Sequence, residues 1–349
     1  MGADTLACMR VGFDASACSR PHSPGVRRVA SRLLEALEGR GALEVVRLSP
    51  GPGDNLRRWR RKVLPRLATD LDLDGLHSFT SSFPWRARTK RVQTVHELPW
   101  KHGEPENATW RHKLWVELGS RRAHRVLCPS RHVARDLGEG PRVRVVPWGV
   151  APIFRPEPRP GTIDEVLLKT YRLGSDPIVL CPGAVRRKKN LAAVLHGVRR
   201  LLDDGPRVEL VVTGEATPDL RRDLALASKL GLASRISTLE SVSDDDLAGL
   251  YRLASAVPLL SRSEGFCLPA AEALASGTPV LVPAGTAQAE VAGAGAILVD
   301  PDDADSVAVG LRRAIEGRER ARFDLPRHAA SYTWQHAAEE IERIWSELA

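Results

Sequence analysis

Short apolar runs alternate with longer segments of helical periodicity along most of the chain. In the first half the apolar runs predict strands, and two longer segments, 25–37 and 107–123, predict helices. The predicted strands are 11–14, 43–48, 92–98, 125–130 and 143–146. Such alternation is typical of βαβ units, in which a helix connects two parallel strands.

Proline and glycine punctuate residues 150–177 and predict a linker. Beyond it the alternation returns: strands are predicted at 178–181, 208–213, 236–239, 256–260, 279–282 and 297–299, and helices at 190–202, 244–254, 269–275 and 333–348. The sequence therefore predicts an α/β protein with two Rossmann-like, doubly wound parallel-sheet domains, 1–157 and 158–332, facing a cleft. A C-terminal helix, 333–349, is expected to pack back on the first domain. Open parallel sheets bind ligands beyond the carboxyl ends of their strands, so functional residues are expected in strand-to-helix loops.

Composition narrows the class of protein. With 43% hydrophobic and 27% charged residues, the 349-residue chain is of globular type. No apolar run approaches the ~18 residues of a membrane span, and the first residues lack the apolar core of a signal peptide. The five cysteines are scattered without a CxxC pair, which favours neither a disulfide framework nor a zinc site. We expect a cytoplasmic protein.

Charge is unevenly distributed along the chain. The net charge is +8, but residues 1–150 carry 27 Lys and Arg against 15 Asp and Glu, and the remainder carries 24 against 28. This excess favours an anionic partner for the first half: a phosphorylated acceptor, a membrane surface or a nucleic acid.

The segment 261–280 carries the most specific chemical signal. A strand is expected to end near Arg262, Pro269 suits a first helical turn, and Gly277 suits a helix end. The start of this helix presents backbone N–H groups and a positive dipole end to a phosphate. Glu264 and Glu272, eight positions apart, can accept hydrogen bonds from the hydroxyls of a sugar and a ribose.

These residues resemble the retaining glycosyltransferases of family 4, which have the GT-B fold and an EGFGLPxxE-type loop with two glutamates. The resemblance implies that Glu264 is catalytic and contacts the transferred sugar, and that Glu272 holds the ribose of the donor. It also implies donor contacts from the residues between them, Gly265, Phe266, Cys267 and Leu268. The family usually has Gly at the position of Cys267.

Further segments resemble the same family in order and spacing. Gly183 to Lys189 resembles its "G…RKN" turn, which implies donor contacts from Gly183, Arg187, Lys188 and Lys189, the last meeting the diphosphate. His96 matches the strand-end "HD" element, which implies a catalytic contact to the sugar. Gly25 matches the first strand-to-helix loop, where a small residue lets the donor phosphate or the acceptor approach the backbone. Three positions depart from the family pattern: Glu97, Trp148 and Ala184.

The resemblance implies transfer of a sugar from a nucleotide-diphosphate donor with retention at the anomeric carbon, with no cofactor besides the donor and no metal. Asp70-Leu-Asp72 has the spelling of the metal motif of other transferases, but a polar turn before Leu76 is the interpretation we prefer. A nucleotide-sugar epimerase of the same architecture is an alternative. A non-enzymatic anion-binding module is another, but no nucleic-acid-binding motif supports it.

One basic segment of the first domain points to the acceptor side. Five basic residues surround a tryptophan, in the order Arg57, Arg58, Trp59, Arg60, Arg61 and Lys62. Basic residues with an interfacial aromatic side chain can bind an anionic bilayer. The segment predicts peripheral contact at the inner face of the membrane and a lipid-linked or anionic acceptor, and a solvated helix between two strands is the alternative.

Overall fold

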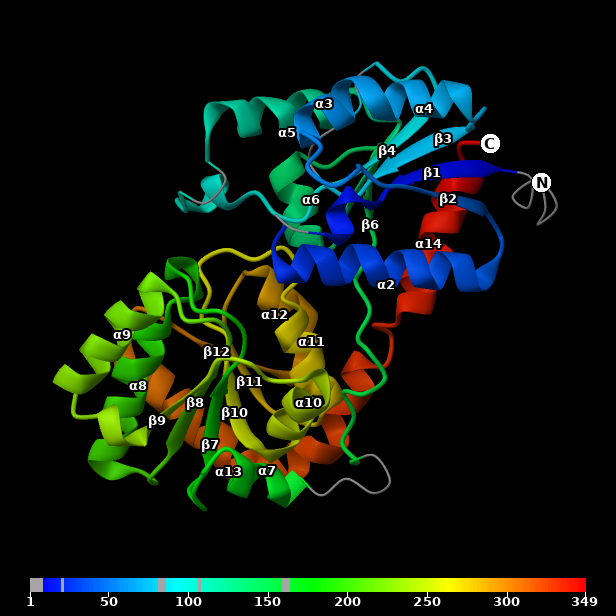
Figure 1. Ribbon diagram of the computed structural model, residues 1–349. Coiled ribbons are helices and arrows are strands. Elements are labelled where there is room, and N and C mark those ends of the chain that lie inside the picture. Colours follow the sequence, from blue (N-terminus) through cyan, green and yellow to red (C-terminus); the bar gives the residue numbers. More distant parts are fainter. Residues whose placement is uncertain (1–8, 20–21, 81–83, 85, 106–107, 159–163) are drawn as a thin grey trace. The chain divides into compact units, whose positions relative to one another are not determined.

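The computed structural model describes residues 9–349 except 20–21, 81–83, 85, 106–107 and 159–163. The chain divides into two compact units, the first formed by Met1–Gly149 with Tyr332–Ala349 and the second by Val150–Ser331. Each unit holds a six-stranded sheet (Figure 1). Every strand pair is parallel, which confirms the predicted fold class.

The sheet of the first unit has the order β2-β1-β3-β4-β5-β6. Its strands are β1 (Arg10–Asp14), β2 (Glu44–Leu48), β3 (Gly75–Ser78), β4 (Lys90–Thr94), β5 (Arg125–Cys128) and β6 (Val143–Val145). The chain leaves β1 for β2 on one side and returns to β3 on the other. The carboxyl end of β1 is therefore a topological switch point, where doubly wound sheets bind ligands.

Helices cover both faces of this sheet (Figure 1). They are α2 (Pro24–Arg40), α3 (Leu56–Arg58), α4 (Leu64–Asp70), α5 (Trp110–Arg122), α6 (Arg131–Leu137) and α14 (Trp334–Ser346). Shorter turns are η1 (Ala15–Cys18), the π-helical turn η2 (Trp59–Val63) and η3 (Pro99–His102).

The last helix, α14, belongs to the first unit although it follows the second in sequence. It packs beside α2, where Arg40 forms ion pairs with Glu339 and Glu342 at 2.8 and 2.9 Å. Its Trp345 is fully buried against Gly75 of β3, where a Cβ would lie 2.2 Å from the indole ring. The glycine therefore makes room for the aromatic side chain of a helix that is 270 positions away in the sequence.

The sheet of the second unit has the order β12-β11-β10-β7-β8-β9. Its strands are β7 (Ile178–Cys181), β8 (Glu209–Thr213), β9 (Ile236–Leu239), β10 (Ala254–Pro258), β11 (Val280–Pro283) and β12 (Ala296–Val299). The central strands β7 and β10 are buried throughout, as expected for a parallel sheet covered on both faces. The chain runs outward in both directions from these two strands, so their carboxyl ends form the switch point of this sheet.

The helices of the second unit are α7 (Asp164–Thr170), α8 (Leu191–Asp204), α9 (Pro218–Lys229), α10 (Asp244–Leu253), α11 (Leu268–Ala275), α12 (Ala287–Ala292) and α13 (Ala304–Ala329). Three short turns, η4 (Arg187–Lys189), η5 (Ala233–Arg235) and η6 (Gly293–Gly295), complete it. Two of these helices, α9 and the 26-residue α13, were not predicted from the sequence.

The predicted linker 150–177 needs correction. It contains α7, and Asp164 at the start of this helix pairs with Arg252 at 2.6 Å. Phe154 lies edge-to-face against Tyr251, with ring centroids 5.7 Å apart. These contacts make the segment part of the second unit, which begins at Val150, so the expected boundary at 157 and 158 falls inside that unit.

Candidate functional site

Two strand-to-helix loops meet at the switch point of the second sheet. One follows β7 and contains η4, and the other follows β10 and leads into α11. The backbone N–H of Arg262 donates to the carbonyl of Lys188 at 2.8 Å, and the Gln288 side chain donates to the carbonyl of Ser261 at 2.8 Å. These bonds fix the second loop against the first and against α12.

A salt bridge joins the two loops at the residues that the sequence singled out. Lys189 Nζ lies 2.8 Å from Glu264 Oε1, and the side chains are 24% and 12% exposed. Burial alone would raise the pKa of the Glu264 carboxyl. The charges of Lys189 and Lys188, with hydrogen bonds from Lys189 and Ser261, outweigh burial and hold that pKa at about 2. Glu264 is therefore a carboxylate at any physiological pH.

The remaining residues of the first loop lie around this pair. Gly183 is exposed, has a positive φ of 85°, and donates its N–H to Thr213 Oγ1 at 3.0 Å. Lys188 is buried, whereas Arg187 is exposed. The backbone N–H of Arg187 donates to Asp219 Oδ2 at 2.9 Å. A small cavity of about 30 Å³ is lined by Gly183, Lys189, Ser261 and neighbouring apolar residues.

The second glutamate is more deeply placed than the first. Glu272 lies on α11 and is 3% exposed, and its Oε2 accepts a hydrogen bond from the Tyr251 hydroxyl at 3.0 Å. Tyr251 comes from α10 and is fully buried. This tyrosine could not be assigned to the site from the sequence, because a single Tyr in an amphipathic helix has the pattern of an ordinary core residue.

Cys267 occupies a backbone position that favours glycine. It is the residue before α11, with φ 72° and ψ 72°, and its side chain is buried. Burial, together with the nearby Glu264 charge, raises the pKa of its thiol to about 12. The departure from the family's glycine therefore places a neutral thiol in strained backbone between Phe266 and Leu268.

His96 lies in the first unit, directly after β4. Its Nε2 lies 2.8 Å from the carbonyl of Phe79, so this nitrogen carries a proton and donates it, and Nδ1 is the acceptor. Burial lowers the pKa of His96 to about 4, so the ring is neutral near pH 7. The ring centroid is 5.8 Å from that of Trp148, the residue that stands in place of the family's asparagine. Gly25, in the first turn of α2, is exposed with open space where a Cβ would lie.

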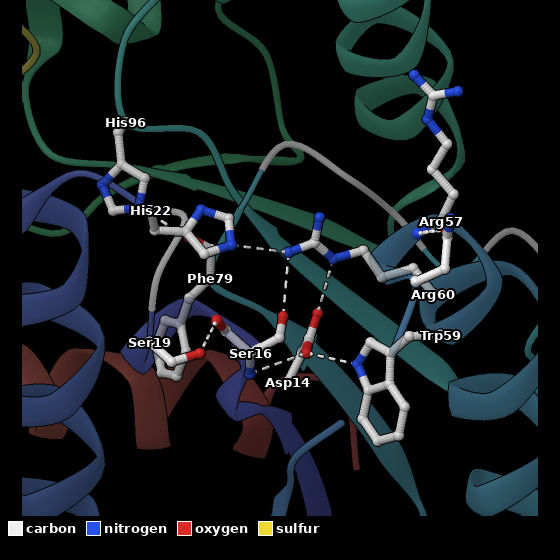
Figure 2. A network of polar contacts seen from close by, with 10 residues as sticks. Asp14, Ser16, Ser19, His22, Arg57, Trp59, Arg60, Phe79 and His96 are labelled. Carbon is white, nitrogen blue, oxygen red and sulfur yellow. Dashed lines mark hydrogen bonds and ion pairs between the residues drawn. The ribbon is translucent and has the colours of Figure 1, made fainter. Parts of the chain in front are cut away.

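A buried polar network stands at the carboxyl end of β1 (Figure 2). Asp14 accepts from Trp59 Nε1 at 2.9 Å and from Arg60 Nε at 3.2 Å. Arg60 Nη2 also contacts Ser16 Oγ at 3.0 Å and His22 Nε2 at 3.1 Å.

This network corrects the membrane prediction for two of its residues. Trp59 and Arg60 are 4% and 7% exposed, so neither can contact a bilayer surface. Their polar atoms bind Asp14, a partner 45 positions earlier that the local sequence could not reveal. Arg57, Arg58, Arg61 and Lys62 remain exposed, and Arg57 extends away from the network (Figure 2).

The exposed arginines border a groove in the first unit. It has a volume of about 470 Å³ and runs between the α3–η2 segment and the start of α5. Arg57 and Arg61 line one side, and Arg111 and Trp110 line the other. Trp110 is 69% exposed, and the Arg111 guanidinium lies 5.3 Å from its ring. Among the described residues no helix combines the length and hydrophobicity needed to cross a bilayer.

Known structures place this architecture in a class. A sucrose-phosphate synthase from Thermosynechococcus elongatus shares the fold with a TM-score of 0.81 over 97% of this chain and 99% of that chain, at 18% identity. The Anabaena protein HepE, solved in complex with UDP and glucose, gives 0.74 over 97% of this chain and 100% of that chain, at 16% identity. The fold is thus GT-B.

Sequence comparison gives the family. The family described as "Glycosyl transferases group 1" matches residues 168–335, and "Glycosyltransferase Family 4" matches residues 23–152. These two ranges take in most of the chain, which therefore belongs to the family 4 glycosyltransferases. The resemblance seen in the sequence is confirmed.

Curated relatives match over shorter stretches. A D-inositol 3-phosphate glycosyltransferase from Corynebacterium jeikeium is 32% identical over 177 residues, 48% of this chain and 42% of the relative. An MMP alpha-(1->4)-mannosyltransferase from Mycolicibacterium hassiacum is 29% identical over 279 residues, 73% of this chain and 64% of the relative. The chain spans about half the length of the curated relatives it matches.

Proposed function

We propose that this protein transfers a sugar from a nucleoside diphosphate to an acceptor hydroxyl with retention of configuration at the anomeric carbon. Family membership supports this reaction, and the Lys189–Glu264 pair at the β7–β10 switch point is the observation that carries it. This pair places one cation and one carboxylate side by side at the position where doubly wound sheets bind ligands.

The charges of the pair suit the two parts of such a donor. The bond between the anomeric carbon and the phosphate oxygen breaks, the bond to the acceptor oxygen forms, and the acceptor proton leaves with the diphosphate. Lys189 and the N-terminal turn of α11 stabilise the charge that develops on the departing diphosphate. Glu264, held ionised, cannot act as an acid. It accepts hydrogen bonds from sugar hydroxyls and stabilises positive charge at the anomeric carbon.

We assign the other donor contacts as the family resemblance implies. Glu272, oriented by the Tyr251 hydroxyl, accepts from the ribose hydroxyls. His96 is neutral and uses Nε2 on the Phe79 carbonyl, so Nδ1 accepts a hydrogen bond from a hydroxyl of the transferred sugar. Gly25 and Gly183 leave room for the donor beside the backbone.

The donor can be tested by thermal shift with UDP, GDP, ADP and dTDP, since a ligand that binds only the folded state raises the melting temperature. Lys189→Ala should abolish the shift from the diphosphate, and Lys229→Ala, an exposed lysine at the end of α9, is the matched control. Proton NMR of the product with the matching nucleotide sugar then reports anomeric configuration. A product of inverted configuration would contradict the proposal. Conversion of the donor sugar without any acceptor would favour the epimerase alternative.

We further propose that the acceptor is anionic and binds the groove of the first unit. Three exposed arginines, Arg57, Arg61 and Arg111, line the groove, and guanidinium groups bind phosphate oxygens strongly. The first curated relatives are named for an inositol phosphate, which agrees with a phosphorylated acceptor.

Charge reversal can test this acceptor site. The double variant Arg57→Glu, Arg61→Glu should raise KM for a phosphorylated acceptor at least tenfold while nucleotide affinity stays unchanged. Arg66→Glu, a solvent-exposed arginine of α4, is the matched control. A different result would assign the groove to a membrane surface: the wild-type protein binds anionic vesicles, the double variant does not, and KM for soluble acceptors is the same in both. An unchanged KM and unchanged vesicle binding would refute an anionic ligand at this groove.

A further inference from the structure

Three potential metal ligands gather in the first unit, and none of them is among the residues assigned above. His102 is the last residue of η3, and His132 and Asp136 lie on α6. One potential ligand atom from each of the three lies within 4.8 Å of those of the other two. Among the described residues this is the one group of three or more such side chains with that geometry.

The positions of these residues on their elements favour joint coordination. His132 and Asp136 are four residues apart on one helix, so their side chains lie on the same face, one turn apart. His102 comes to this face from a separate element, with Nε2 2.7 Å from Asp136 Oδ2. The two imidazole rings are stacked, with centroids 4.9 Å apart and an angle of 25° between their planes, so one ring must rotate before the in-plane lone pairs of both can point at a common metal.

We propose that His102, His132 and Asp136 bind a divalent transition metal of the zinc, cobalt or nickel type. Bonds of about 2.0–2.2 Å to nitrogen and oxygen place tetrahedral ligand atoms about 3.3 Å apart. The observed upper limit of 4.8 Å requires a shift of about 1.5 Å, which side-chain rotations supply. A water molecule would complete the tetrahedron.

The chemistry of the donor set selects the class of metal. Imidazole suits zinc, nickel and copper, whereas calcium and magnesium need several oxygen ligands. Only one carboxylate is present in the group, and its sequence neighbours Lys101, Arg131 and Arg135 are basic. The Lys101 ammonium donates to the backbone carbonyl of Asp136 and not to its carboxylate. The hard cations are therefore disfavoured at this site.

The metal would act on the structure and take no part in sugar transfer. η3 begins three residues after His96, and α6 directly follows the β5 loop. A bound metal would join the segment that follows His96 to α6, across 30 residues of sequence. We expect it to stabilise the first unit and to order the loop that carries His96.

Binding can be measured on untagged, chelator-treated protein, since a polyhistidine tag would itself bind the probe. Titration calorimetry with zinc chloride should give one site per chain with micromolar affinity or tighter. His132→Ala and Asp136→Asn should each weaken that affinity at least tenfold, because each removes or neutralises a ligand. His336→Ala is the matched control: this exposed histidine has one carboxylate, Glu339, 3.7 Å away and no third ligand among the described residues.

Two further measurements test the metal site even if a variant is unstable. Urea unfolding without metal shows whether each variant folds, and the visible spectrum of the cobalt-loaded wild-type protein reports its ligands. Intense d–d bands typical of a tetrahedral site, lost in both ligand variants, would support the site. Zinc affinity that both folded variants retain, or a cobalt spectrum of the hexaaqua ion, would overturn it.

Discussion

The Lys189–Glu264 salt bridge sets the charge of the candidate donor site, and Lys189→Met removes one half of it while keeping most of the side-chain length. In the native protein burial opposes ionisation of Glu264, but the lysine charges hold its pKa at about 2, against an ordinary value of 4.5. Without Lys189 the effect of burial meets less opposition. We therefore expect the pKa of Glu264 to rise in the variant.

The magnitude follows from this pKa difference. A fall from 4.5 to about 2 corresponds to roughly 3 kcal/mol in favour of the folded state. The side chains are 12% and 24% exposed, so solvent screens part of this stabilisation, and we expect a loss of about 1–3 kcal/mol at pH 7. Because the folded pKa is the lower one, the stabilisation is present above pH 4.5 and is lost as the pH falls toward 2. The difference between wild type and variant should shrink with it.

The assay is urea unfolding at pH 7, 4 and 3, followed by far-ultraviolet circular dichroism. Tryptophan fluorescence does not report on the second unit, which contains Lys189 and Glu264, because all eight tryptophans lie in the first unit. In a Glu264→Gln background the effect of Lys189→Met should not depend on pH. An equal loss of stability at pH 7 and pH 3 in the wild-type background would refute the electrostatic account.

Further outcomes are expected at three sites, Cys267, Gly75 and His77. Cys267 should resist iodoacetamide at pH 8 in the folded protein, since its buried thiol has a pKa of about 12. The free energy of unfolding of Cys267→Gly should lie within about 1 kcal/mol of the wild-type value, because relief of the strained φ offsets the loss of the side chain. Gly75→Ala should lower the unfolding free energy of the first unit by about 1–3 kcal/mol, seen by tryptophan fluorescence. If the clash with Trp345 is the cause, the same substitution should cost less in a Trp345→Leu background than in the wild type. His77 is buried with a pKa of about 3, so this unit should lose stability as the pH falls from 6.5 toward 3. His77→Phe should flatten that dependence, and an unaltered pH profile would contradict it.

Much of the second sheet could be predicted from the sequence because most of its strands are short apolar runs, and the central strands β7 and β10 are buried throughout. Ile178–Cys181 and Ile236–Leu239 match their predicted ranges, and the other strands differ by one or two residues. β3 was missed because Gly75–Ser78 contains no β-branched residue and only one aliphatic side chain. Its burial depends on a tryptophan from the far end of the chain, which local patterning does not register.

The residue types of the candidate site were also visible in the sequence, but their pairings were not. Lys189 and Glu264 were each expected to face a ligand, and their contact arises from the adjacency of β7 and β10, 75 positions apart in the chain. Arg60 appeared to be one of several surface charges. Its burial follows from Asp14, 46 positions earlier, and from the switch point at the end of β1.

The discontinuous first unit has a consequence for synthesis. Residues 1–149 leave the ribosome long before α14, so the first unit cannot be completed until synthesis is nearly finished. The second unit is one continuous stretch of the chain and needs no later segment to complete it. Until α14 arrives, the apolar surface that will receive Ile341, Ile344 and Trp345 stays uncovered. A product that stops anywhere before residue 334 therefore displays a hydrophobic face that the finished protein hides, and chaperones and proteases can recognise the incomplete chain by that face.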